Sequence, residues 1–142
     1  MTSKKKHDSL ELWPAAQQAS AAARNRLSTG FARHDAVSAL CDELERGGYS
    51  VDRMVWLPER AGATDLNCGM VVDVLVEKNL ALVVETDPKN ARRSGDMLPQ
   101  VISRGNYSQA AVLMFGDGVA YQRLEKSAAS EAASNDAGAP RS

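Results

Sequence analysis

The sequence GMVVDVLVEKNLALVVETDPK, residues 69–89, decides the fold of this chain. It contains two apolar runs rich in β-branched residues, Met70–Val76 and Leu80–Glu85, on either side of the polar segment Glu77–Asn79. This pattern predicts a tight β-hairpin whose two strands are both largely buried.

Three acidic residues interrupt this hairpin: Asp73 within the first strand, and Glu85 and Asp87 at the end of the second. Side chains alternate between faces along a strand, so Asp73 is expected to share a face with Val71 and Leu75, and Glu85 with Asp87. If the register brings these faces together, the carboxylates meet at one edge of the core and suit a hard cation such as Mg²⁺. Hydrated acids at strand ends are the alternative interpretation.

Composition sets broad limits on the chain. Its 142 residues, 44% of them hydrophobic, are enough for one domain with a real core. The formal net charge of −1 argues against nucleic-acid binding by overall charge, and it leaves a local basic patch open.

The cysteines and the hydropathy pattern concern metal binding and location. Cys41 and Cys68 form no CxxC motif and have no histidine nearby, which argues against a zinc site. Two thiols fit a reducing cytoplasm, and a disulfide between them stays open. The sequence shows no signal peptide and no apolar run of spanning length, so we expect a cytoplasmic protein without a membrane partner.

The remaining elements are predicted from apolar spacing and from Gly and Pro. In chain order they are a helix within Ser9–Arg26 that begins near Pro14, a helix at Phe31–Arg46, a strand at Tyr49–Leu57, the hairpin, a polar basic segment at Lys89–Gly95, a helix at Asp96–Ser103, and strands at Ala110–Phe115 and Val119–Leu124. The first helix has an alanine-rich face and is expected to dock loosely. This order predicts an α/β (α+β) domain with a mixed sheet and helices packed on it.

Five short motifs occur in a consistent order and spacing. They are Arg53-Met-Val-Trp-Leu-Pro58, Asp73-Val-Leu-Val-Glu77, Leu82-Val-Val-Glu85, Gln100 and Leu113-Met-Phe-Gly116. Through them, Leu27–Glu125 resembles the PD-(D/E)XK nuclease superfamily, and most closely its small bacterial GxxExxY proteins. The resemblance implies a restriction-endonuclease-like mixed β-sheet core flanked by helices over residues 27–126. Residues 1–26 would form a basic tail and an alanine-rich helix, and residues 127–142 a disordered tail.

The resemblance also implies a catalytic site. Asp73 and Glu85 would hold Mg²⁺ or Mn²⁺, which activates water and polarises the phosphate, and Gln100 would orient the site. The lysine of the family's ExK motif falls on Asp87, and losing such a cation costs roughly a hundredfold or more in rate. Two compensations stay open at this point: Asp87 as a third metal ligand, and Lys89 as a displaced catalytic cation.

Other family positions are altered as well. The glutamate of GxxExxY falls on Arg33 and its tyrosine on Ala36, and Arg104 stands where the family has a tyrosine after the helix glutamine. Arg104 is four residues from Gln100, on the same helix face, and could reach the site from that helix as a third compensation for the missing lysine.

A basic group follows the hairpin and is predicted to contact nucleic-acid phosphates. Its members are Lys89, Arg92, Arg93 and Arg104. A solvated basic loop is the alternative interpretation of the same residues.

These observations support three functions. The first is a degenerate domain, non-catalytic or weakly active, that binds DNA, RNA or a protein partner and needs no cofactor. The second is a Mg²⁺- or Mn²⁺-dependent nuclease that hydrolyses DNA or RNA phosphodiester bonds. The third is a structural subunit that forms a homodimer, or docks on a partner, through a sheet edge or the alanine-rich helix.

Overall fold

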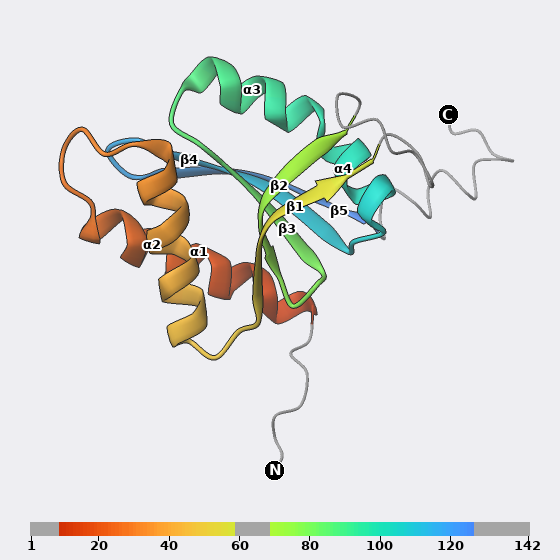
Figure 1. Ribbon diagram of the computed structural model, residues 1–142, viewed down its shortest axis with the longest axis horizontal. Helices are drawn as coiled ribbons and strands as arrows, with labels where there is room; N and C mark the ends of the chain where they lie inside the picture. Colours follow the sequence, from red (N-terminus) through yellow and green to blue (C-terminus); the bar gives the residue numbers. More distant parts are fainter. Residues whose placement is uncertain (1–8, 59–68, 127–142) are drawn as a thin grey trace, which may run out of the picture.

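The computed structural model describes residues 9–58 and 69–126 of the chain, which form four helices and five strands (Figure 1). In chain order these are α1 Ser9–Arg26, α2 Arg33–Arg46, β1 Val51–Leu57, β2 Met70–Val76, β3 Leu80–Glu85, α3 Pro88–Asp96, α4 Leu98–Gly105, β4 Gln109–Phe115 and β5 Val119–Glu125. Cys68 and the two terminal tails lie outside the described residues.

The strands form one mixed sheet in the order β1-β2-β3-β4-β5. β3 and β4 run parallel, and the other neighbouring pairs are antiparallel. A parallel pair needs a crossover between its strands, and α3 and α4 supply it. The predicted class, a mixed β-sheet core flanked by helices, is confirmed.

Helices cover both faces of the sheet. Leu82 and Val84 of β3 pack in one hydrophobic cluster with α1 and α2, whereas Ala81 and Val83 pack in a second cluster with α4 and with Ala91 of α3. This alternation along β3 follows from the pleat, because successive side chains point to opposite faces. Both strands of the hairpin are therefore largely buried, as the sequence predicts.

The hairpin has the predicted bounds and the predicted turn. Glu77 and Lys78 adopt positive φ values of 52° and 54°, and the N–H of Asn79 donates to the carbonyl of Val76 at 2.9 Å. Two consecutive positive φ values are typical of the type I′ turn, whose twist matches that of the strands it joins.

The first helix differs from the prediction in two ways. It is already helical at Ser9, with Pro14 inside it. It is also firmly docked, because Ala16 and Ala23 are fully buried in the cluster shared with α2 and the sheet. Small side chains let two helix backbones approach closely, so an alanine face packs tightly despite its low hydrophobicity.

The segment after the hairpin also differs from the prediction. The expected basic loop at Lys89–Gly95 is helix α3, and the helix expected at Asp96–Ser103 is α4, which begins at Leu98. None of the helices within residues 9–58 and 69–126 is long and apolar enough to cross a membrane.

Candidate functional site: a buried ion pair and a basic helix

Asp73 lies inside the sheet, with only 2% of its surface exposed. Its Oδ2 accepts a hydrogen bond of 2.7 Å from the backbone N–H of Val84 on β3. Its Oδ1 accepts a hydrogen bond from the guanidinium of Arg33, with which it forms an ion pair. Both oxygens of this buried carboxylate therefore have partners within the protein, as a buried charge requires.

Arg33 is the first residue of α2, and the start of that helix is fixed locally. The carboxylate of Asp35 accepts a hydrogen bond of 2.9 Å from the N–H of Ala32, the residue before the helix. An acid that reaches back in this way satisfies an amide that has no intrahelical partner. The first turn of α2 thus holds Arg33 over the sheet.

Arg33 and Asp73 together replace a piece of the strand ladder. The β2–β3 pairing ends with Val74 opposite Leu82. Beyond that point Asp73 accepts from the N–H of Val84, and Nε of Arg33 donates to the carbonyl of Val84 at 2.8 Å. The N–H and C=O of one strand residue point to the same side of the strand. Asp73 and Arg33 therefore hydrogen bond the backbone N–H and C=O of Val84 on the side of β3 where the pairing with β2 has ended.

The expected shared face of Asp73 and Leu75 is wrong. Leu75 packs in the cluster on the α4 side together with Val72, three residues away, whereas Asp73 binds Arg33 of α2. The alternation of β2 therefore changes beside Asp73. On β1, Met54 has a φ of 51° between the residues that pair with Val74 and Val72. This local departure from extended backbone accompanies the change, and alternation counted from sequence cannot reveal it.

Glu85 faces the other layer of helices. Its Oε2 accepts a hydrogen bond of 2.7 Å from the hydroxyl of Ser94 on α3. Asp73 and Glu85 thus take partners from helices on opposite faces of the sheet.

Asp87 is the N-cap of α3. Its Oδ1 accepts a hydrogen bond of 2.8 Å from the N–H of Lys89, and Pro88 occupies the first helical position. Asp followed by Pro is a standard helix-start signal, because the acid binds a free amide and the proline lacks one. That signal was present in the sequence, and it marks where α3 begins.

The implied divalent cation was compared with this donor set. Asp73 already carries a guanidinium, so a cation there would have to displace Arg33 or sit beside its positive charge. Within residues 9–58 and 69–126, no three His, Cys, Asp or Glu side chains form a group that could hold a metal ion. Among the described residues Asp73, Glu85 and Asp87 therefore do not form a three-acid group, and the metal requirement stays a prediction.

Gln100 and Arg104 lie on a common face of α4, as their spacing predicts. Nη2 of Arg104 donates to Oε1 of Gln100 at 2.9 Å. In the described part of the chain, neither side chain hydrogen bonds to Asp73, Glu85 or Asp87.

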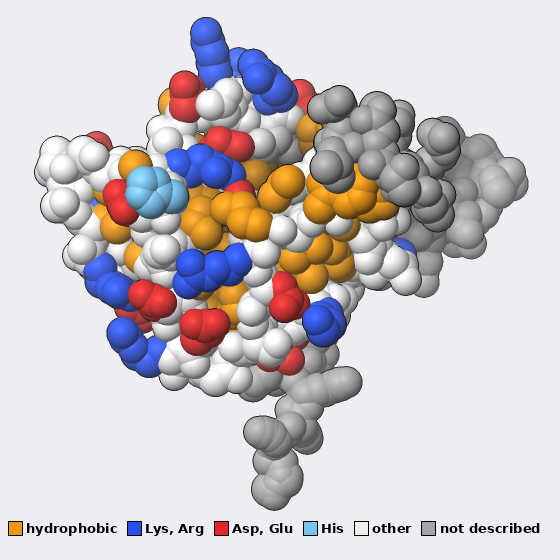
Figure 2. Space-filling view, in the orientation of Figure 1, with side chains coloured by type: hydrophobic (Ala, Val, Ile, Leu, Met, Phe, Trp, Pro, Cys, Tyr) orange, Lys and Arg blue, Asp and Glu red, His pale blue; other side chains and the backbone are white. Residues whose placement is uncertain are grey.

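Helix α3 carries a basic face formed by Lys89, Arg92 and Arg93, which we call the α3 cations. All three are exposed, and their spacing of i, i+3 and i+4 places them on one side of the helix. Their side chains form no ion pair or hydrogen bond with any residue of the two described ranges. Figure 2 shows basic side chains projecting at the top of the molecule, where Figure 1 places α3.

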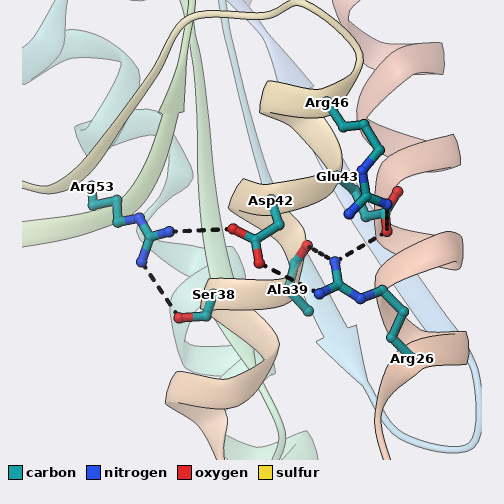
Figure 3. Close-up of polar contacts among 7 residues, drawn as sticks. All are labelled: Arg26, Ser38, Ala39, Asp42, Glu43, Arg46 and Arg53. Carbon is teal, nitrogen blue, oxygen red and sulfur yellow. Dashed lines mark hydrogen bonds and ion pairs between the residues drawn. The ribbon is translucent and has the colours of Figure 1, made fainter.

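The arginines around α2 provide a contrast (Figure 3). Asp42 pairs with Arg26 and Arg53, and Glu43 pairs with Arg26 and Arg46. The arginines around α2 are therefore paired with acids, whereas the α3 cations have no such partner among the described residues.

Cys41 is not a candidate nucleophile. Burial raises the pKa of its thiol to about 11, so the thiol stays protonated at neutral pH. Its side chain is fully buried in the cluster under α2.

Comparison with known proteins gives one structural similarity. No protein-family model matches the sequence, and no curated protein matches it. The crystal structure of an alkaline exonuclease from Laribacter hongkongensis is similar to this chain, with 11% sequence identity and a TM-score of 0.42. The similarity covers 90% of this chain and 89% of that chain. A similarity at this level carries no argument about function.

Proposed function

We propose that this chain is a non-catalytic, nuclease-like domain that binds nucleic acid through the α3 cations without a divalent metal. The observation that carries this proposal is the exposed basic face of Lys89, Arg92 and Arg93, whose side chains pair with no residue in the part of the chain that the structure describes. Phosphate contacts from Lys and Arg supply most of the affinity of nonspecific nucleic-acid binding. The nearby N-cap Asp87 forms no ion pair with these cations among the described contacts. Its Oδ1 accepts a hydrogen bond from the backbone N–H of Lys89 instead.

The ion pair of Arg33 with Asp73 supports the non-catalytic part of the proposal. Arg33 stands where the resembled proteins have a glutamate, and it brings its own positive charge to the buried carboxylate. A bound metal would supply a positive charge that compensates Asp73. The guanidinium of Arg33 supplies that charge instead. A fixed guanidinium cannot generate a metal-bound hydroxide, so the water-activating step of such nucleases has no equivalent here.

Binding is tested by fluorescence anisotropy with a labelled oligonucleotide in EDTA. We expect wild type to bind and Lys89→Gln/Arg92→Gln/Arg93→Gln to lose at least about tenfold in affinity. The matched control compares Arg92→Gln with Arg46→Gln, which removes the same charge from α2. The α3 variant should weaken binding more than the control does. Equal effects, or no binding by wild type, would overturn the proposal.

Catalysis is tested separately on single- and double-stranded DNA and on RNA with Mg²⁺ or Mn²⁺. We expect no cleavage by wild type. Cleavage that disappears in Asp73→Asn would contradict the proposal and would establish the metal-dependent nuclease instead.

A second candidate function, binding of a protein partner or a second copy, is favoured by the β1 edge. β1 lies at one edge of the sheet of the described residues, and Met54 of β1 and Val71 of the neighbouring β2 are 51% and 49% exposed. Figure 2 shows hydrophobic side chains gathered on this face. Exposed apolar residues at a sheet edge are typical of an interface. Light scattering tests this candidate: an oligomer that becomes monomeric in Met54→Lys would support it, and a monomeric wild type would exclude the second copy.

A further inference from the structure

A groove of about 300 Å³ lies between α3 and the last two strands. Residues from three elements line it. They include Ala91 and Arg92 of α3, Val112 and Met114 of β4, and Ala120 and Gln122 of β5. Arg92 belongs both to this groove and to the α3 cations, so the groove adjoins the proposed phosphate-binding face.

The floor and the rim of the groove differ in chemistry. Val112, Met114 and Ala120 give it an apolar floor, and Ala120 is exposed there. The side chain of Gln122 makes no hydrogen bond with any described residue, which leaves an amide donor and acceptor for a ligand. Arg92 adds a planar cation at the rim.

The Gln122 side chain lies against Gly95 of α3. A Cβ on residue 95 would lie 2.2 Å from Oε1 of Gln122, so the amide occupies space that the glycine leaves open. The amide therefore lies between β5 and α3, beside the groove.

We propose that this groove receives one unstacked nucleobase of a single-stranded nucleic acid whose phosphates contact the α3 cations. The inference rests on the proposed function and adds the form of the nucleic acid. An unpaired base offers a flat apolar face for the groove floor and for the guanidinium of Arg92, and a polar edge for Gln122. A base in a duplex is stacked and paired, so it cannot enter.

Charge complementarity selects this occupant. Helix α3 carries three cations that have no acidic partner among the described residues, and one of them, Arg92, lines the groove. A single strand places an anionic phosphate beside each flat base. Tyr121 also lines the groove. Its hydroxyl is 3.0 Å from the hydroxyl of Ser20 on α1, so we do not assign its ring as the surface on which the base stacks.

The test measures the affinity of the full chain for three labelled probes of equal length: a single strand, the same strand with abasic sites, and a duplex. We expect wild type to bind the normal strand about tenfold more tightly than the abasic strand. Ala120→Leu should remove this preference and leave affinity for the abasic strand unchanged, because leucine fills the groove without changing charge. Ala21→Leu, at an exposed position of α1, is the matched control and should keep the preference.

Gln122→Ala is a second variant. It removes the side-chain amide without filling the groove, and it should also reduce the preference for the normal strand over the abasic strand. Equal binding of normal and abasic strands by wild type would overturn the groove inference and leave the phosphate-binding face standing. A preference that survives both groove variants would also overturn it. If wild type binds none of the probes, the proposed function fails together with this inference.

Discussion

At the scale of single residues, the ion pair of Arg33 and Asp73 is the feature that most changes the interpretation of this chain. Asp73 is 2% exposed, and its charge is balanced by a guanidinium and one backbone N–H. Removing one partner of a buried pair costs more than the pair contributes, because the remaining charge is left without compensation.

Removing the guanidinium should therefore destabilise the fold. We expect Arg33→Met to lower the free energy of unfolding by about 2–4 kcal/mol, the lower end reflecting partial solvent access to Arg33. Arg46→Met, which breaks an exposed pair with Glu43, should cost less than about 1 kcal/mol. Urea unfolding measures both. Similar small losses in the two variants would show that the buried pair has no special role.

Restoring the acid of the resembled family should restore a need for metal. In Arg33→Glu, a second carboxylate stands beside the buried Asp73, so the variant should be destabilised without a divalent cation. Mg²⁺ or Mn²⁺ that binds only the folded state should raise its Tm. We expect no such rise for wild type in the same thermal melts. A rise of equal size in wild type would mean that the native site already holds a metal.

At the scale of elements, the hairpin was predictable from sequence and α3 was not. The hairpin has two β-branched runs of strand length and a polar turn between them, and those local signals agree with the fold. Helix α3 has a single buried residue, Gly95, so it shows no apolar periodicity. The start of α3 is marked in the sequence by Asp87-Pro88, but the same two residues also fit a strand that ends at a proline. The docking of α1 through alanines was equally hidden, because small residues pack by shape.

Asp87 should behave as a helix cap. We expect Asp87→Ala to lower stability by about 1 kcal/mol, and Asp87→Asn to retain most of it, because asparagine also caps. Asp87→Lys introduces a lysine where the resembled proteins have one but loses the cap, so it should be destabilised and gain no nuclease activity. Thermal melts and a cleavage assay with Mg²⁺ test these variants. Cleavage that appears in Asp87→Lys would show that a working metal site lacks only this lysine.

At the scale of the whole molecule, the candidate acids and cations could be identified from the sequence, but the residues that they contact could not. Glu85 and Asp87 bind Ser94 and the N–H of Lys89, which are near in sequence. Asp73 binds Arg33, on a different element and 40 positions away. Pairing at that distance depends on how α2 lies over the sheet, which no local pattern encodes. The altered family position at Arg33 was a signal, and only the fold shows what it contacts.

The proposed binding of an anionic polymer by a chain of net charge −1 depends on how its charges are distributed. Acidic residues pair with the arginines around α2, whereas the basic face of α3 has no such partners among the described residues. Local charge then determines affinity, because charges beyond about 10 Å are screened at ordinary ionic strength.

The most direct test of this account is the salt dependence of single-strand binding, measured by anisotropy in EDTA. Three phosphate contacts predict a slope of log K against log salt of about −2 for wild type. Lys89→Gln/Arg92→Gln/Arg93→Gln should bring that slope close to zero. Binding by wild type that needs Mg²⁺, or a steep slope that survives in the triple variant, would contradict the claim that α3 binds nucleic acid without a metal.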